Sequence, residues 1–132
     1  LSGVIDPDQI DGKAALFIDY EDRATLFDSL VLCRFYRDFY LWDQLSEMIG
    51  LATGQSMNKS SLEKIASDIK NNTRRFNINE GMTHHEDCLP KRFFTEALEN
   101  GALIRESELT QMVKDYYRLR GWSDTGIPKP FI

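Results

Sequence analysis

Asp28 stands out because its chemical type differs from that of its surroundings. Apolar residues flank it on both sides, namely Leu26, Phe27, Leu30 and Val31. A carboxylate that is buried without a partner costs several kcal/mol, so Asp28 needs solvent or a partner. One interpretation is a helical aspartate that faces solvent or meets a nearby arginine, as most aspartates do. The other is a carboxylate that binds a polar ligand.

Cys33 follows five residues after Asp28. On one continuous helix the two side chains would point about 140° apart, so they could not reach the same ligand. Both can serve one site only if the helix ends between residues 29 and 32 and a turn delivers Cys33. Without a ligand, Cys33 is interpreted as a reduced, buried small hydrophobe. The residues alone leave both interpretations open.

His84, His85 and Cys88 form a second group whose residue types could bind a ligand, in this case zinc. A zinc site normally takes four ligands, and no fourth candidate is evident nearby. We therefore predict a solvated loop over these residues and no zinc site.

The elements that must position these side chains are helices. Apolar residues repeat with helical period in several segments, and no alternating strand pattern of useful length is visible. The sequence therefore predicts an all-α fold, an irregular multi-helix domain with about four to six helices. The expected helices cover 41–53, 60–76, 91–99 and 107–120, with a further helix start at Asp6 and an extended tail over 122–132.

Polar residues with the chemistry of helix caps mark two of the expected starts. Ser60 is followed three residues later by Glu63, which is the capping-box pattern. Ser107 is in a position to cap the last helix, and Gly121 to end it. These residues therefore set the predicted helix bounds.

Residues 26–42 are apolar on more than one face of a helix. A helix that packs on one side has a polar reverse, whereas this segment must be covered on several sides. The cover is either the chain's own helices or a partner domain that is missing here, and we favour the partner domain.

Length and composition describe an ordinary globular chain. Its 132 residues are enough for a single domain over 1–132, with 42% hydrophobic and 28% charged residues. A net charge of -5 without a dense basic run argues against nucleic acid, and no apolar stretch is long enough to span a membrane. Two cysteines are too few for a disulfide scaffold, so we expect a cytoplasmic protein. The Leu-Ser-Gly start is expected of a piece cut from a longer chain.

Three segments carry specific motifs: 28–35 reads DSLVLCRF, 77–92 reads NINEGMTHHEDCLPKR, and 115–122 reads DYYRLRGW. In the same order, they resemble the Asp-x-x-Gly-Leu-Cys segment, the Asn-x-x-Glu-Gly loop with its Asp-x-Leu-Pro-x-Arg continuation, and the Tyr-Tyr-x-x-Arg-Gly-Trp signature of the aldehyde:ferredoxin oxidoreductase family. The segments are spread over most of the chain. The chain thus resembles the C-terminal helical domain of these enzymes.

The resemblance implies a function. It predicts a fragment of an enzyme that oxidises aldehydes to carboxylic acids and passes the electrons to ferredoxin. Such an enzyme holds tungsten, or molybdenum, on two pterins beside a four-iron four-sulfur cluster. The remaining domains of the enzyme, ferredoxin and the aldehyde are then the expected partners.

The resemblance also assigns residues. It makes Cys33 one ligand of the iron–sulfur cluster, places Asp28 on one pterin, and adds Arg34 to the pterin site through its backbone. It places no catalytic residue in this chain. The isolated chain is therefore expected to be inactive and to carry no cofactor.

Val31 departs from the family pattern, which has glycine at this position. A valine there could forbid a positive φ or a close approach of the backbone to the cofactor. The alternative to the enzyme hypothesis is a stand-alone helical module that binds a protein through residues 26–42, with no metal on Cys33.

Overall fold

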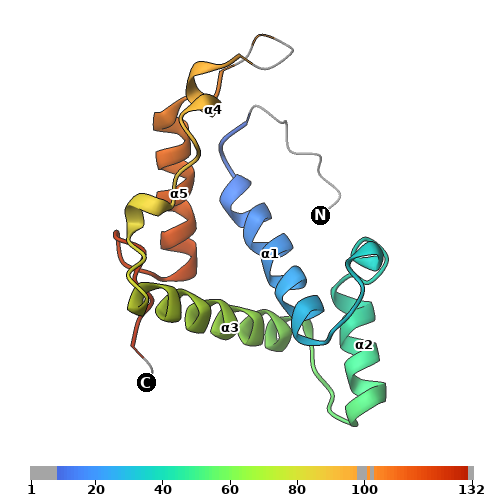
Figure 1. Ribbon diagram of the computed structural model, residues 1–132. Helices are drawn as coiled ribbons and strands as arrows, with labels where there is room; N and C mark the ends of the chain where they lie inside the picture. The colour runs from blue at the N-terminus through green and yellow to red at the C-terminus, as the bar shows by residue number, and fades with distance from the viewer. Residues whose placement is uncertain (1–8, 98–100, 102, 131–132) are drawn as a thin grey trace. The chain divides into compact units, whose positions relative to one another are not determined.

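The computed structural model describes residues 9–97, 101 and 103–130, and helices make up all of its regular elements (Figure 1). The α-helices are α1 (Lys13–Ser29), α2 (Trp42–Thr53), α3 (Lys59–Asn79), α4 (Arg92–Thr95) and α5 (Glu106–Arg120). Two short 3₁₀ helices, η1 (Arg34–Tyr36) and η2 (His84–Glu86), follow α1 and α3. The prediction of an all-α fold is confirmed. None of the described helices has the length and apolar character needed to cross a membrane.

The chain divides into two compact units. Unit 2 is residues 17–74, which hold most of α1, η1, α2 and most of α3. Unit 1 combines residues 1–16 with residues 75–132 and so contains the end of α3, η2, α4 and α5. The two candidate groups identified in the sequence belong to different units, residues 28–34 to unit 2 and residues 83–88 to unit 1.

Unit 2 has a hydrophobic core to which three helices contribute. Its buried members are Leu26 and Phe27 of α1, Trp42 and Leu45 of α2, and Leu62 and Ala66 of α3. The α2 pair is three residues apart and the α3 pair four, which are the spacings that bring side chains to one face of a helix, whereas Leu26 and Phe27 are neighbours at the end of α1. The start of the apolar segment 26–42 is therefore covered by the chain's own helices.

Unit 1 is organised around the C-terminal half of α5. The Tyr117 side chain is buried, and its hydroxyl donates to the carboxylate of Asp87. The Tyr116 ring meets the Trp122 ring edge to face at 5.5 Å, an arrangement that aromatic pairs favour. The tail after α5 makes a turn, in which the Ser123 amide donates to the Ile127 carbonyl at 2.9 Å.

Two helix starts differ from the predicted ones. α3 begins at Lys59, and the Asn58 side chain accepts a hydrogen bond from the Ser61 amide at 2.9 Å, so Ser60 lies inside the helix. α5 begins at Glu106 after Arg105, which leaves Ser107 inside as well. Asparagine caps a helix at least as well as serine, so the sequence offered two neighbouring caps for α3.

The remaining bounds are close to the predicted ones. α2 covers almost the predicted range, and α4 is shorter than predicted because the backbone is extended again at Glu96. The predicted start at Asp6 lies outside the described residues. α1 begins directly after Gly12, which has a φ of 83°.

Candidate functional site

The candidate site is built on the end of α1. The Val31 amide donates to the Asp28 carbonyl at 3.2 Å, and the Leu32 amide donates to the Phe27 carbonyl at 2.8 Å. These two bonds form a Schellman motif, which ends a helix and reverses the chain direction. Leu32 also packs against the buried core of unit 2. The helix therefore ends between Asp28 and Cys33, as a shared site requires.

Val31 takes the left-handed position of this motif, with a φ of 56°. α3 and α5 end with the same pair of bonds, and the corresponding residues are Gly81 and Gly121. Left-handed backbone is a genuine outlier for a β-branched residue. The suspicion that valine would forbid a positive φ is wrong, because the hydrogen bonds of the motif hold Val31 in that conformation.

Asp28 and Arg34 form a bidentate ion pair across this turn. The Arg34 Nε donates to Asp28 Oδ1 at 2.9 Å, and Arg34 Nη2 donates to Asp28 Oδ2. The bond to the guanidinium lowers the pKa of the Asp28 carboxyl below its ordinary value. Both side chains are more than half exposed, so the pair adds little to stability. It fixes the direction of the carboxylate instead.

Cys33 is exposed and is not part of a disulfide. Its backbone precedes η1, and its carbonyl accepts from the Tyr36 amide at 3.1 Å. The interpretation as a buried small hydrophobe is therefore wrong. The carbonyl of Arg34 accepts from both the amide and the guanidinium of Arg37, at 3.2 Å each, so this part of the Arg34 backbone is already engaged.

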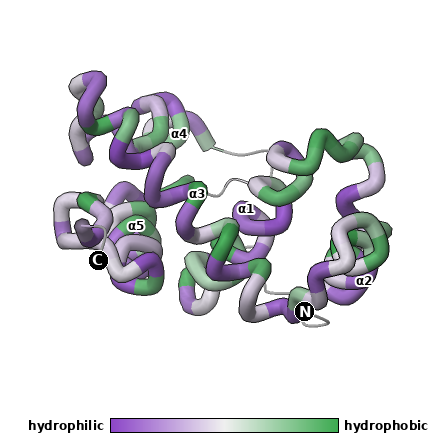
Figure 2. The backbone as a smooth tube through the Cα atoms, turned by 90° about the horizontal axis from the view of Figure 1, so that it is seen from below, coloured by the Kyte–Doolittle hydropathy of each residue, from purple (hydrophilic) through white to green (hydrophobic). Residues whose placement is uncertain are grey.

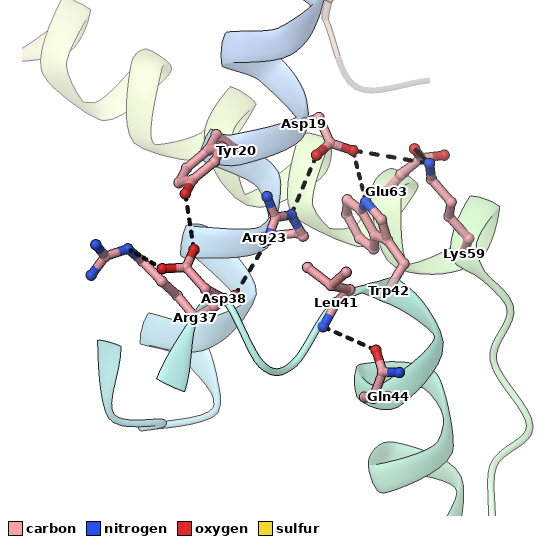
Figure 3. Close-up of polar contacts among 10 residues, drawn as sticks. All are labelled: Asp19, Tyr20, Arg23, Arg37, Asp38, Leu41, Trp42, Gln44, Lys59 and Glu63. Carbon is pink, nitrogen blue, oxygen red and sulfur yellow. Dashed lines mark hydrogen bonds and ion pairs between the residues drawn. The ribbon is translucent and has the colours of Figure 1, made fainter. Parts of the chain in front are cut away.

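Two hydrogen bonds tie the segment after η1 to α1 (Figure 3). The Arg23 guanidinium donates to the Arg37 carbonyl at 3.3 Å, and the Tyr20 hydroxyl donates to the Asp38 carboxylate at 3.0 Å. Both donors come from the middle of α1. These two bonds therefore hold the end of the segment that follows Cys33 against α1.

Asp19 joins all three helices of unit 2 (Figure 3). Its carboxylate accepts from the Trp42 indole at 2.7 Å and from the Arg23 Nε at 3.3 Å, and it lies 3.9 Å from the Lys59 ammonium. Trp42 begins α2 and Lys59 begins α3. Asp19 therefore sets where both helices start relative to α1.

A pocket opens beside the turn, and three arginines contribute to its wall. The residues that line it are Tyr20, Arg23, Ala24, Phe27, Arg34 and Arg37. Each of the arginines has an acidic partner within 4 Å, namely Asp19, Asp28 and Asp38. These carboxylates offset part of the positive charge that the three arginines bring to the pocket wall.

The second candidate group lies on the loop around η2. The His84 and His85 rings stack with their centroids 4.0 Å apart, and Cys88 is exposed. In the part of the chain that the structure describes, no three His, Cys, Asp or Glu side chains are placed to hold a metal ion. The Glu86 carboxylate accepts from both the amide and the hydroxyl of Thr83, which closes this turn on itself.

Comparison with known proteins identifies the family. Residues 3–131 match the family described as aldehyde ferredoxin oxidoreductase, domains 2 and 3. The chain belongs to this family. It is 33% identical, over 95% of its length, to the tungsten-containing aldehyde ferredoxin oxidoreductases of Pyrococcus furiosus and Thermococcus kodakarensis.

The match covers 21% of each of these two enzymes, so the chain spans about a fifth of the length of its relatives. The family resemblance seen in the three motifs is thereby confirmed. The chain corresponds to part of an oxidoreductase whose relatives contain tungsten.

The structure brings Asp28, Cys33 and Arg34 together on one turn of unit 2. Sequence reasoning missed the residues that hold this turn, Asp19 and Arg23. Their i, i+4 spacing on a helix is a recognisable ion-pair pattern and could have drawn attention to them. Their contacts with Trp42 and the Arg37 carbonyl depend on the tertiary fold and leave no local signal.

Proposed function

We propose that this chain contributes Cys33 as one ligand of a four-iron four-sulfur cluster and Asp28 as an anchor for a pterin. The enzyme would oxidise aldehydes to carboxylic acids with ferredoxin as the electron acceptor. We place it in the cytoplasm, where exposed thiols such as Cys33 and Cys88 stay reduced. The rest of the same enzyme, its aldehyde substrate and ferredoxin would be its partners.

The observation that carries the proposal is the end of α1 between Asp28 and Cys33. A continuous helix would separate the two side chains, whereas the Schellman turn places them at the two ends of one short segment. A thiolate is the usual ligand of an iron–sulfur cluster. A carboxylate suits the paired N–H groups of an aminopyrimidinone edge, because it accepts two parallel hydrogen bonds.

The residues present fit these groups. The Cys33 thiol is exposed, and the backbone on both sides of it is fixed by hydrogen bonds. Asp28 is an exposed aspartate, which is ionised at neutral pH in any case, and the hydrogen bond from Arg34 lowers its pKa further. When bound, a tungsten pterin and an iron–sulfur cluster supply the oxidation of the aldehyde and the path for electrons. The part of this chain is to hold both groups close together through a single turn.

The proposal assigns a role to the guanidinium of Arg34, whereas the sequence resemblance implied a contact through its backbone. Its guanidinium covers both oxygens of Asp28, so it occupies the edge that a pterin would use. The two parallel hydrogen bonds of a pterin edge would therefore replace those from Arg34, because both sets use the same pair of carboxylate lone pairs. Arg34 would then contribute its charge beside the pterin.

The alternative, a stand-alone module that binds a protein partner without metal, is favoured by one observation. Several large apolar side chains between α1 and α2 are exposed, among them Val31, Phe35 and Phe39. Contact with the rest of a longer enzyme accounts for the same exposure. Cluster content distinguishes the two functions, because the module needs none.

The test compares the two exposed cysteines in the full-length enzyme. Cys33→Ser should lose or alter the cluster, because a serine hydroxyl is a poor substitute for a thiolate. Cys88→Ser is the matched control and should keep the wild-type signal. Iron content and electron paramagnetic resonance of the dithionite-reduced protein measure both. A wild-type signal in Cys33→Ser, with aldehyde-dependent ferredoxin reduction retained, would contradict the assignment.

A further inference from the structure

The two most exposed large apolar side chains in the described part of the chain lie on either side of Cys33. Val31 is 91% exposed and Phe35 is 88% exposed. They stand two residues before and two residues after the cysteine. Figure 2 shows that parts of the stretch between α1 and α2 have the green of hydrophobic residues, next to parts in the colours of more hydrophilic ones. The candidate ligand is therefore set between two apolar groups that this chain leaves in solvent.

The left-handed backbone conformation at position 31 is unfavourable for valine, yet the sequence has valine there. Left-handed φ costs an L-residue with a β-carbon roughly 1–2 kcal/mol. Glycine meets the same demand at Gly81 and Gly121, where the same hydrogen bonds end α3 and α5. Strain of this kind collects at functional sites, where a particular side chain is needed. A side chain that contacts only water gives no reason for the strain.

The groups that would pack against Val31 and Phe35 must come from outside this chain. A four-iron four-sulfur cluster takes four thiolates as a rule. Cys33 supplies one, and the described residues contain no group of three His, Cys, Asp or Glu side chains able to hold a metal. The relatives are about five times longer than this chain. The other ligands would therefore belong to a further segment of the same polypeptide.

We propose that Val31 and Phe35 form an apolar rim around Cys33 that packs against the cluster-bearing segment of the same polypeptide and keeps water from the cluster. This inference rests on the proposed function, because it needs Cys33 to be a ligand. The rim residues position no reacting atom. They tune the cluster through the solvent that they exclude.

The physical effect of the rim is on the reduction potential. A reduced cluster carries one more negative charge than the oxidised cluster, and water stabilises the more highly charged form. Solvent exposure is one of the factors that set the potential of such clusters. An apolar cover around the ligand therefore holds the potential low. Removing the cover should shift it to a more positive value.

The experiment uses the full-length enzyme and a potentiometric titration of its cluster, followed by electron paramagnetic resonance. Val31→Gly and Phe35→Ala should each shift the midpoint potential to a more positive value while iron content stays complete. Neither variant threatens the turn, because glycine suits the left-handed backbone and Phe35 makes little contact within the chain. Phe35→Leu keeps an apolar cover and should restore most of the wild-type potential.

Leu51→Ala is the control, since Leu51 is an exposed apolar residue of α2 that does not flank Cys33. It should leave the potential unchanged. Unchanged potentials in Val31→Gly and Phe35→Ala, with the cluster lost in Cys33→Ser, would overturn the rim and leave the ligand assignment intact. An equal shift in Leu51→Ala would also overturn it. A cluster retained in Cys33→Ser would overturn the ligand assignment and the rim together.

Discussion

Asp28 had two interpretations, of which the structure confirms the pairing with an arginine, while its role as a ligand stays a proposal. From its surroundings it was expected either to meet an arginine or solvent, or to bind a ligand. In the structure it is more than half exposed and pairs with Arg34. Arg34 stands six residues away, which is not a helical contact spacing, so the pair exists because α1 ends between them. Such a contact can be predicted only once the turn is known.

Asp28→Asn should weaken retention of the pterin in the full-length enzyme. The amide keeps the shape of the side chain but loses the charge and one acceptor oxygen. Hydrogen bonds to charged groups contribute about 1.5–3 kcal/mol, so part of this amount should be lost. Tungsten content per protein after gel filtration measures the effect. Asp68→Asn, which changes an exposed aspartate of α3 in unit 2 away from the turn, is the control. Equal tungsten content in both variants would argue against the pterin role of Asp28.

At the scale of elements, helical periodicity was enough to locate α2, α3 and α5. Their apolar residues repeat on one face, and burial on that face is what stabilises a helix in a protein. The starts were less predictable, because Asn58 and Ser60 both have the chemistry of a cap. The turn after α1 could not be predicted from the sequence for a different reason. Its left-handed residue is a valine, whereas the usual signal for such an ending is glycine.

The turn around η2 provides a test at this scale. Hydrogen bonds from the Thr83 amide and hydroxyl lower the pKa of Glu86. A carboxyl with a lowered pKa stabilises the folded state fully above its ordinary pKa. This contribution is lost as the pH falls from the ordinary value through the lowered one. We therefore expect the Thr83 amide resonance to titrate below the ordinary range of glutamate.

Glu86→Gln should abolish this titration and make the stability of the turn less dependent on acid pH. Nuclear magnetic resonance of the Thr83 amide between neutral and acid pH measures it. Glu80→Gln changes another glutamate of the same region and should leave the titration in place. A Thr83 midpoint within or above the ordinary range would show that the two hydrogen bonds are not formed in solution.

At the scale of the whole molecule, the site that we propose would not be complete within this chain. Its core in unit 2 is built from its own helices, so folding of that unit is accounted for by the residues present. The candidate ligands are exposed, and the described residues offer no further metal-binding group. The family accounts for this, since the relatives are much longer than the chain. No pattern within these residues could have named the substrate.

The isolated 132-residue chain should therefore hold no cluster after anaerobic treatment with iron and sulfide. One thiolate in four gives too little binding to persist through desalting. Iron analysis and the visible absorption spectrum measure the outcome, and the full-length enzyme treated in parallel is the control. Stoichiometric iron on the isolated chain would contradict the view that its site is incomplete.

The turns after α3 and after α1 can be compared directly, and the residues of the α3 turn are those that suit the local stability of such a turn. Both have the same backbone bonds and the same following 3₁₀ helix. Gly81 stands where Val31 does, Thr83 where Cys33 does, and Glu86 where Tyr36 does. At each of these positions the residue in the turn after α1 stabilises the turn less well than its counterpart in the turn after α3. Unit 2 thus gives up local stability in the turn that carries Cys33, the residue that we assign to the cluster, a local trade-off between stability and the proposed function.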